Sequence, residues 1–207
     1  MTDRYARQIV LPEVGPSGQA RLAAARVLVV GAGGLGCPVL HYLAAAGIGR
    51  LIVVDPDRVE ESNLHRQPLY TMADIGARKV EAARAALLRL NPDIAVEALA
   101  QRLTPGNATA LVAAADIVVD AADSLAATYV LSDACLQQHT PLISASAVGL
   151  AGYVGGFCAG APSYRAVFPE MPARAASCSS AGVLGSVVGL LGSLQAQFVL
   201  QWLLDIE

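Results

Sequence analysis

Short runs of apolar, β-branched residues alternate along the chain with longer stretches whose apolar positions recur at helical spacing. The short runs predict buried parallel strands, because a strand covered on both faces is almost continuously hydrophobic. The predicted strands are 26–30, 51–55, 94–99, 117–120, 141–144 and 153–157. The predicted helices are 38–46, 75–90, 108–115 and 124–139, with one more at the C-terminus. This alternation predicts an α/β, Rossmann-like, mostly parallel sheet with helices on both faces.

Two C-terminal segments depart from the alternation. Residues 159–181 are rich in Pro, Ser, Ala and Arg and lack periodicity, which predicts a long flexible loop. Residues 175–204 carry no charge and are long enough to cross a bilayer. Their glutamines would each be costly in lipid, so a buried or interface helix is favoured over a membrane span. We expect this apolar helix to help build a homodimer.

Composition excludes several classes of protein. With 207 residues, 55% hydrophobic and 15% charged, the chain can bury a full core and is not disordered. A net charge of −3 without a basic run argues against a nucleic-acid partner. The N-terminus has no apolar signal region, and the 4 cysteines form no C-x-x-C pair, so we expect a cytoplasmic protein without disulfides.

A glycine motif follows the first predicted strand and precedes the first predicted helix. It reads Gly31-Ala32-Gly33-Gly34-Leu35-Gly36. Glycines in this context let backbone amides approach a phosphate at a helix N-terminus. Asp55 ends the next strand, where a carboxylate takes ribose hydroxyls. We predict a nucleotide site lined by Gly31, Gly33, Gly34 and Asp55.

The glycine motif alone does not decide the nucleotide, and a nicotinamide dinucleotide oxidoreductase is one alternative. Polar and cationic residues follow Asp55: Asp57, Ser62, Asn63, Arg66, Gln67 and Lys79. Two cations beside a nucleotide suit a triphosphate. Asp120 and Asp123 follow the fourth strand, where a carboxylate could hold Mg²⁺ together with phosphates. The pattern therefore favours Mg-ATP over NAD.

A series of ordered motifs resembles the ThiF/MoeB/HesA family of ubiquitin-activating-like adenylyltransferases, with a leaning toward its ThiF branch. The first of them are Arg4-Tyr5-x-Arg7-Gln8, the glycine motif with Cys37-Pro38, Tyr42-Leu43-Ala44-Ala45-Ala46-Gly47-Ile48-Gly49 and Ser62-Asn63-Leu64-x-Arg66-Gln67. The others are Asp74-Ile75-Gly76-x-x-Lys79, Asn91-Pro92, Tyr164-Arg165-x-x-Phe168-Pro169 and Ala181-Gly182-Val183-Leu184-Gly185. The resemblance runs from about Arg4 to the end, which identifies 1–207 as a single ThiF-like domain.

The resemblance implies an activity. Such enzymes use Mg-ATP to adenylate the C-terminal glycine carboxylate of a small ubiquitin-like sulfur carrier ending in Gly-Gly. A sulfurtransferase then helps to convert the acyl-adenylate into a thiocarboxylate, and the enzymes are usually homodimers. Carried over, Asp55 would hold the ribose, Arg66 and Lys79 the phosphates, and Asp123 the magnesium. Arg7 would reach the phosphates from the partner subunit.

The cysteines and histidines have no metal-ligand spacing. Cys178 matches a family cysteine that can bond covalently to the carrier, and an inert loop cysteine is the alternative. Cys37, Cys135 and Cys158 are expected to be packed in the core.

Four positions depart from the family pattern. Relatives often carry zinc-binding cysteines where this chain has Ser163 and Ala166, so we expect no zinc site. Relatives often carry Asn and Arg where this chain has Ser124 and Thr128. A catalytically impaired scaffold that binds nucleotide or carrier therefore remains a second hypothesis.

Overall fold

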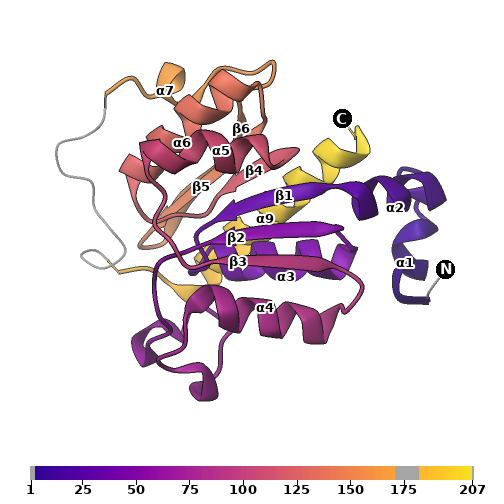
Figure 1. Cartoon of the computed structure of the whole chain (residues 1–207), viewed down its shortest axis with the longest axis horizontal. Coiled ribbons are helices and arrows are strands. Elements are labelled where there is room, and N and C mark those ends of the chain that lie inside the picture. The colour runs from indigo at the N-terminus through magenta and orange to yellow at the C-terminus, as the bar shows by residue number, and fades with distance from the viewer. Residues whose placement is uncertain (1–2, 171–181, 207) are drawn as a thin grey trace.

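The computed structural model describes residues 3–170 and 182–206 of the chain (Figure 1). Its centre is a six-stranded sheet in the order β3-β2-β1-β4-β5-β6. Neighbouring strands pair in parallel except for β6, which runs antiparallel to β5. The strands are β1 Arg26–Val30, β2 Arg50–Val54, β3 Ala95–Leu99, β4 Ile117–Asp120, β5 Leu142–Val148 and β6 Ala151–Phe157. The mostly parallel, Rossmann-like sheet predicted from the sequence is confirmed.

Helices cover both faces of the sheet. They are α1 Ala6–Ile9, α2 Gly15–Ala24, α3 Gly36–Ala46, α4 Lys79–Leu90, α5 Pro105–Ala113, α6 Leu125–Gln138, α7 Tyr164–Val167 and α9 Gly185–Leu204. The core on one face includes residues of α2, α3, α4 and α9, and the core on the other includes residues of α5 and α6. Short 3₁₀ turns lie at Glu61–Asn63 and Met72–Asp74.

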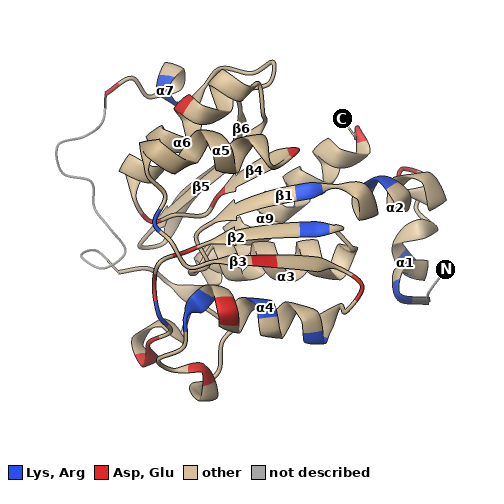
Figure 2. Cartoon of the chain, viewed as in Figure 1, with Lys and Arg blue, Asp and Glu red and all other residues tan. Residues whose placement is uncertain are grey.

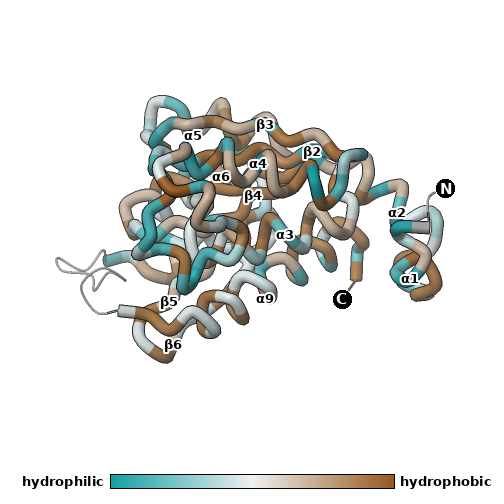
Figure 3. The backbone as a smooth tube through the Cα atoms, turned by 90° about the horizontal axis from the view of Figure 1, so that it is seen from below, coloured by the Kyte–Doolittle hydropathy of each residue, from teal (hydrophilic) through white to brown (hydrophobic). Residues whose placement is uncertain are grey.

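Side chains of each central strand alternate between the two cores. In β1, Val27 and Val29 join the core beneath α3, whereas Leu28 and Val30 join the core beneath α5 and α6. This alternation follows from the pleat of a strand, and burial on both faces explains why the strand reads as continuously apolar. Figure 3 shows hydrophobic colour along the central strands, and a mixture of hydrophobic and pale segments along α9.

Several element boundaries differ from the prediction, two of them by four residues. The helix predicted from residue 75 begins at Lys79, because Gly76 adopts a left-handed φ of 86° and the chain turns there. The fifth strand continues to Val148, since it pairs along its whole length with β6 in a hairpin. A short-range pattern does not reveal that pairing partner.

Part of the loop predicted over 159–181 is ordered as helix α7. Arg165 forms an ion pair with Asp133 of α6 at 2.7 Å, and its guanidinium lies 4.7 Å from the centre of the Tyr129 ring. The Tyr129 hydroxyl donates to the carbonyl of Phe168 at 2.7 Å. These contacts with α6 hold the segment in place, and residues 171–181 lie outside the described part of the chain.

The C-terminal helix α9 is long and apolar enough to cross a membrane, and 39% of its most apolar window is buried within the structure. Figure 2 shows no charged residue along it. It packs on α3 and on β5, and the Gln195 amide donates to the carbonyls of Asp120 at 2.7 Å and Ile143 at 3.2 Å. The helix therefore forms part of the sheet's covering layer. Its other side exposes Leu190, Leu194 and Trp202.

Candidate functional site

The candidate site lies where the strand order reverses, at the carboxyl ends of β1, β2 and β4. The chain runs from β1 outward through β2 and β3, then returns to place β4 on the other side of β1. Val30 of β1 is in register with both Val54 and Asp120, so the loops that follow the three strands begin side by side. Such a switch point is the usual ligand crevice of an open α/β sheet. A cavity of about 860 Å³ opens there, within the range of small-molecule sites.

The glycine motif forms one wall of this cavity. Gly31 has a φ of 100°, and a Cβ at this position would lie 2.4 Å from the carbonyl oxygen of Ala121. A Cβ on Gly36 would lie 2.0 Å from the carbonyl oxygen of Gly31. These two glycines let the loop turn tightly into α3, while Gly33 and Gly34 line the cavity as predicted. The glycine loop thus brings its backbone to the wall of the cavity, and its phosphate-binding role stays a prediction.

Asp55 fastens the glycine loop. Its carboxylate accepts the backbone N–H of Ala32 at 2.8 Å and that of Asp57 at 2.8 Å. The carbonyl of Ala32 accepts the hydroxyl of Tyr70 at 2.7 Å, which holds the same residue from its other side. Asp55 also lines the cavity, and a carboxylate has lone pairs for further donors. The ribose-binding role predicted for Asp55 is therefore compatible with its structural role.

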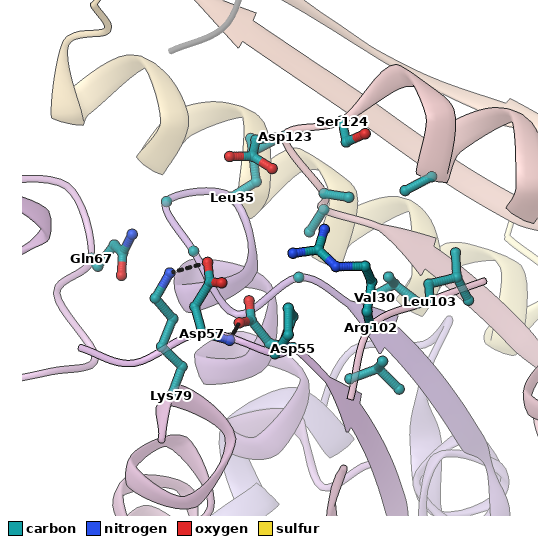
Figure 4. A pocket seen from close by; sticks show the side chains of 18 of the residues that line it. Val30, Leu35, Asp55, Asp57, Gln67, Lys79, Arg102, Leu103, Asp123 and Ser124 are labelled. Atoms are coloured by element: carbon teal, nitrogen blue, oxygen red, sulfur yellow. Dashed lines mark hydrogen bonds and ion pairs between the residues drawn. The ribbon is translucent and has the colours of Figure 1, made fainter. Parts of the chain in front are cut away.

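Two cations line the cavity, one from the start of α4 and one from the loop after β2. The Lys79 ammonium is buried and lies 3.2 Å from the Asp57 carboxylate, as the dashed line in Figure 4 shows. Burial of an ammonium group requires such a partner. Arg66 lines the cavity with its guanidinium anchored to the Ser62 carbonyl at 3.1 Å. Both predicted phosphate-binding cations are thus brought to one site.

Buried amides accompany these cations. Asn63 and Gln67 are almost fully buried and line the cavity. The Oε1 atom of Gln67 has no hydrogen-bond partner among the described residues, and its side chain lies on the Lys79 side of the cavity (Figure 4). A buried acceptor without a partner is costly unless a water or a ligand supplies a donor. This side of the cavity is therefore polar and incompletely satisfied.

The two carboxylates after β4 have different surroundings. Asp123 is exposed, lines the cavity and accepts no hydrogen bond from another described residue (Figure 4). An unengaged carboxylate beside a phosphate cradle fits Mg²⁺, which binds one or two carboxylates plus phosphate oxygens.

Asp120 does not line the cavity, so the magnesium role predicted for one carboxylate of this pair stays with Asp123. It is fully buried, and its carboxylate accepts the Ser144 hydroxyl at 2.8 Å and the Ala122 N–H at 3.2 Å. Burial raises the pKa of the Asp120 carboxyl to about 6. Asp120 therefore braces the start of the loop that carries Asp123.

Helix N-termini add to the positive character of the cavity. Leu35 precedes α3, Lys79 begins α4 and Ser124 precedes α6, and all three residues line the cavity. The first N–H groups of a helix lack intrahelical partners and carry partial positive charge. The cavity is thus suited to a ligand with several negative charges.

The remaining site predictions concern Arg7, Cys178 and the positions of the family's zinc ligands. Arg7 is on α1, which Figure 1 shows at the amino ends of the strands, so it does not line the cavity of its own chain. Cys178 lies outside the described residues. At the positions of the family's zinc ligands, the Ser163 hydroxyl caps α7 by accepting the Ala166 N–H at 3.2 Å. Within the described chain, no group of three or more His, Cys, Asp or Glu could hold a metal. The other cysteines, Cys37, Cys135 and Cys158, are buried as expected.

Sequence reasoning missed the second half of the cavity. This half is lined by the loop after β3 and by α6; its residues are Gln101, Arg102, Leu103, Thr104, Pro105, Ala126, Ala127 and Val130. Most of them are apolar, whereas the Lys79 half is polar. The sequence offered one indication of this wall, because a loop that follows a parallel strand lies at the same edge of the sheet as the glycine motif.

The fold and the cavity together define a Rossmann-like α/β domain, with two cations and a free carboxylate beside a glycine loop. The chain belongs to the ThiF family, whose model matches residues 5–207.

Individual relatives agree with this assignment. The chain is 52% identical to the adenylyltransferase and sulfurtransferase MOCS3 of Bos taurus over 201 residues, which cover 96% of this chain and 44% of MOCS3. It is 47% identical over 212 residues to a sulfur carrier protein adenylyltransferase of Thermus thermophilus, covering 99% of this chain and 78% of the relative. Among solved structures, E. coli MccB with ATP is similar with a TM-score of 0.82 and 26% identity, covering 100% of this chain and 65% of that one. The chain thus spans less than half the length of MOCS3.

Proposed function

We propose that this chain adenylates the C-terminal glycine carboxylate of a small ubiquitin-like sulfur carrier, using Mg-ATP. The observation that carries the proposal is the convergence of Lys79, Arg66 and Asp123 on a cavity walled by the glycine loop and Asp55. ThiF-family membership and the name of the Thermus thermophilus relative support the same activity. The whole of 1–207 would act as one adenylyltransferase domain.

The proposed roles follow from the charges involved. The attacking glycine carboxylate is ionised at neutral pH, since a free α-carboxyl has a pKa of roughly 3.5, so no general base is required. An anion must then approach an anionic phosphate, and catalysis consists of positioning and electrostatic stabilisation. Lys79 and Arg66 would bind phosphate oxygens, Asp55 would hold the ribose, and Asn63 and Gln67 would donate amide hydrogens to the ligand. Asp123 would hold Mg²⁺, which neutralises charge on the phosphoryl oxygens.

We also propose that the chain forms a homodimer. An apolar strip on α9, formed by Leu190, Leu194 and Trp202, is exposed in the single chain and suits a homodimer interface. In such a dimer Arg7 would act in the partner's site. A sulfurtransferase would receive the acyl-adenylate, with Cys178 as a candidate for covalent attachment of the carrier. We propose a cytoplasmic enzyme without nucleic-acid or membrane partners.

ATP–pyrophosphate exchange tests this proposal directly. Exchange should depend on Mg²⁺ and on a carrier that ends in Gly-Gly, and a carrier truncated by these two residues is the control. Calorimetry should show tighter binding of Mg-ATP than of NAD, and the opposite order would reject the nucleotide assignment.

One observation favours a second function. Ser124 and Thr128 stand where relatives often have Asn and Arg, and Ser124 lines the cavity itself. A chain that binds Mg-ATP and the carrier but gives no exchange would be the binding scaffold.

A further inference from the structure

The half of the cavity away from Lys79 has apolar walls. Leu103 of the loop after β3 and Val130 of α6 both pack on the core beneath α5 and α6, and both line the cavity. Val30 lies beside them at the end of β1 (Figure 4). A flat, apolar ring fits between such walls, whereas a phosphate would lose its hydration there without compensation.

The backbone of Arg102 is held in place beside these walls. Its carbonyl accepts the side-chain N–H of Asn107 at 2.9 Å. The other end of the same amide, Asn107 Oδ1, accepts the N–H of Thr104 at 2.8 Å as half of a capping box at the start of α5. The Cα of Arg102 is therefore held by the first turn of a helix.

The side chain of Arg102, in contrast, is free. Its guanidinium forms no hydrogen bond or ion pair with any other residue that the structure describes, and Figure 4 shows it extending into the cavity. Two other exposed arginines are engaged: Arg26 pairs with Asp116 at 2.6 Å, and Arg165 pairs with Asp133 at 2.7 Å. Exposed arginines of α4, such as Arg84, also lack a partner among the described residues, but they do not line the cavity. Arg102 is thus a planar cation with a fixed origin and no partner among the described residues.

The orientation of a nucleotide in the cavity follows from the two halves. Lys79 and Arg66 mark the phosphate end, and Asp55 marks the ribose between the halves. The base must then enter the apolar half, beneath Arg102. We propose that the Arg102 guanidinium stacks on the purine base of ATP and closes this half of the site. The inference rests on the proposed function for the identity of the nucleotide, and the geometry suits a guanidinium because it is planar and attracted to a π face.

Binding measurements with two ligands test the inference. Calorimetry should show Arg102→Ala binding Mg-ATP roughly threefold to thirtyfold more weakly than the wild type, the range expected for a cation–π contact. Binding of inorganic tripolyphosphate with Mg²⁺ should not change, because this ligand has no base. Arg102→Lys should recover only part of the ATP affinity, since an ammonium cannot lie flat on a ring. The control is Arg84→Ala, which removes an exposed arginine of α4 outside the cavity.

The outcomes separate this inference from the proposed function. Equal losses for ATP and tripolyphosphate would show that Arg102 contacts phosphates and would overturn the stacking. Full recovery by lysine would overturn it as well. If the wild type binds Mg-ATP and Arg102→Ala binds it equally well, only the inference fails; if the wild type does not bind Mg-ATP, the proposed function fails with it. The melting temperature of Arg102→Ala should equal that of the wild type, because the side chain has no hydrogen bond or ion pair with the described residues to lose.

Discussion

Replacing Asp120 by asparagine should stabilise the protein at neutral pH. Burial raises the pKa of the Asp120 carboxyl from 3.8 to about 6. The folded protein therefore binds this proton more tightly than the unfolded chain does. The stability that this difference contributes is fully present below pH 3.8 and is lost as the pH rises through 6. The loss amounts to about 3 kcal/mol of the free energy of unfolding. An asparagine side chain at this position would remain neutral at every pH and would not incur it.

The surroundings of Asp120 favour this isosteric exchange. An asparagine can accept the N–H of Ala122 through its oxygen and donate its amide hydrogen to the Ser144 hydroxyl, so both present hydrogen bonds have a replacement. The hydroxyl of Thr128 also faces the carboxylate and can accept or donate.

Urea denaturation of both proteins between pH 4 and pH 8 measures the effect. The difference in the free energy of unfolding between Asp120→Asn and the wild type should grow from pH 4 to pH 6 and stay constant above pH 7, at up to about 3 kcal/mol. Asp93→Asn, which removes an exposed carboxylate 3.9 Å from Arg4, is the matched control for the loss of one negative charge. A difference independent of pH, or a variant less stable than the wild type at pH 8, would refute the reasoning.

Three further outcomes are expected. Asp123→Ala should abolish pyrophosphate exchange while leaving the melting temperature unchanged, because the side chain faces the cavity; near-normal exchange would show that magnesium is held elsewhere. Mixing inactive Arg7→Ala and Asp123→Ala chains should restore some exchange, because one site in each mixed dimer would keep both residues. Full activity from a species that sediments as a monomer would contradict that arrangement. Elemental analysis should find no stoichiometric zinc, because Ser163 and Ala166 replace thiolates, and one zinc ion per chain would disprove this.

The sheet could be predicted from the sequence because its chemistry is local. Each central strand is buried on both faces, so a run such as 26–30 is apolar throughout and is easily recognised. The start of α4 was misplaced because Ile75 continues the apolar pattern while Gly76 turns the backbone away from the helix. The extent of β5 depends on pairing with β6, which is a contact between segments that no local period records.

The site residues also differ in whether local sequence reveals them. The glycine motif, Asp55 and Lys79 could be predicted because their residue types and their places after strands carry the chemistry. The inward orientation of Asp120 could not, since Asp120 and Asp123 look alike in sequence and differ only in which way each side chain points. Arg102 could not be predicted either, because arginines are common in surface loops and only the fold shows that this one lines the cavity.

The ion pair between Lys79 and Asp57 has a consequence for turnover. A buried ammonium already paired at 3.2 Å attracts an incoming triphosphate less strongly than a bare one would. In the proposed reaction, the same carboxylate would be in place to pair with the ammonium again when pyrophosphate departs. The internal anion would thus weaken the hold on the leaving product. Some initial affinity would be exchanged for easier product release, the step that often limits the rate of an enzyme with a highly charged product.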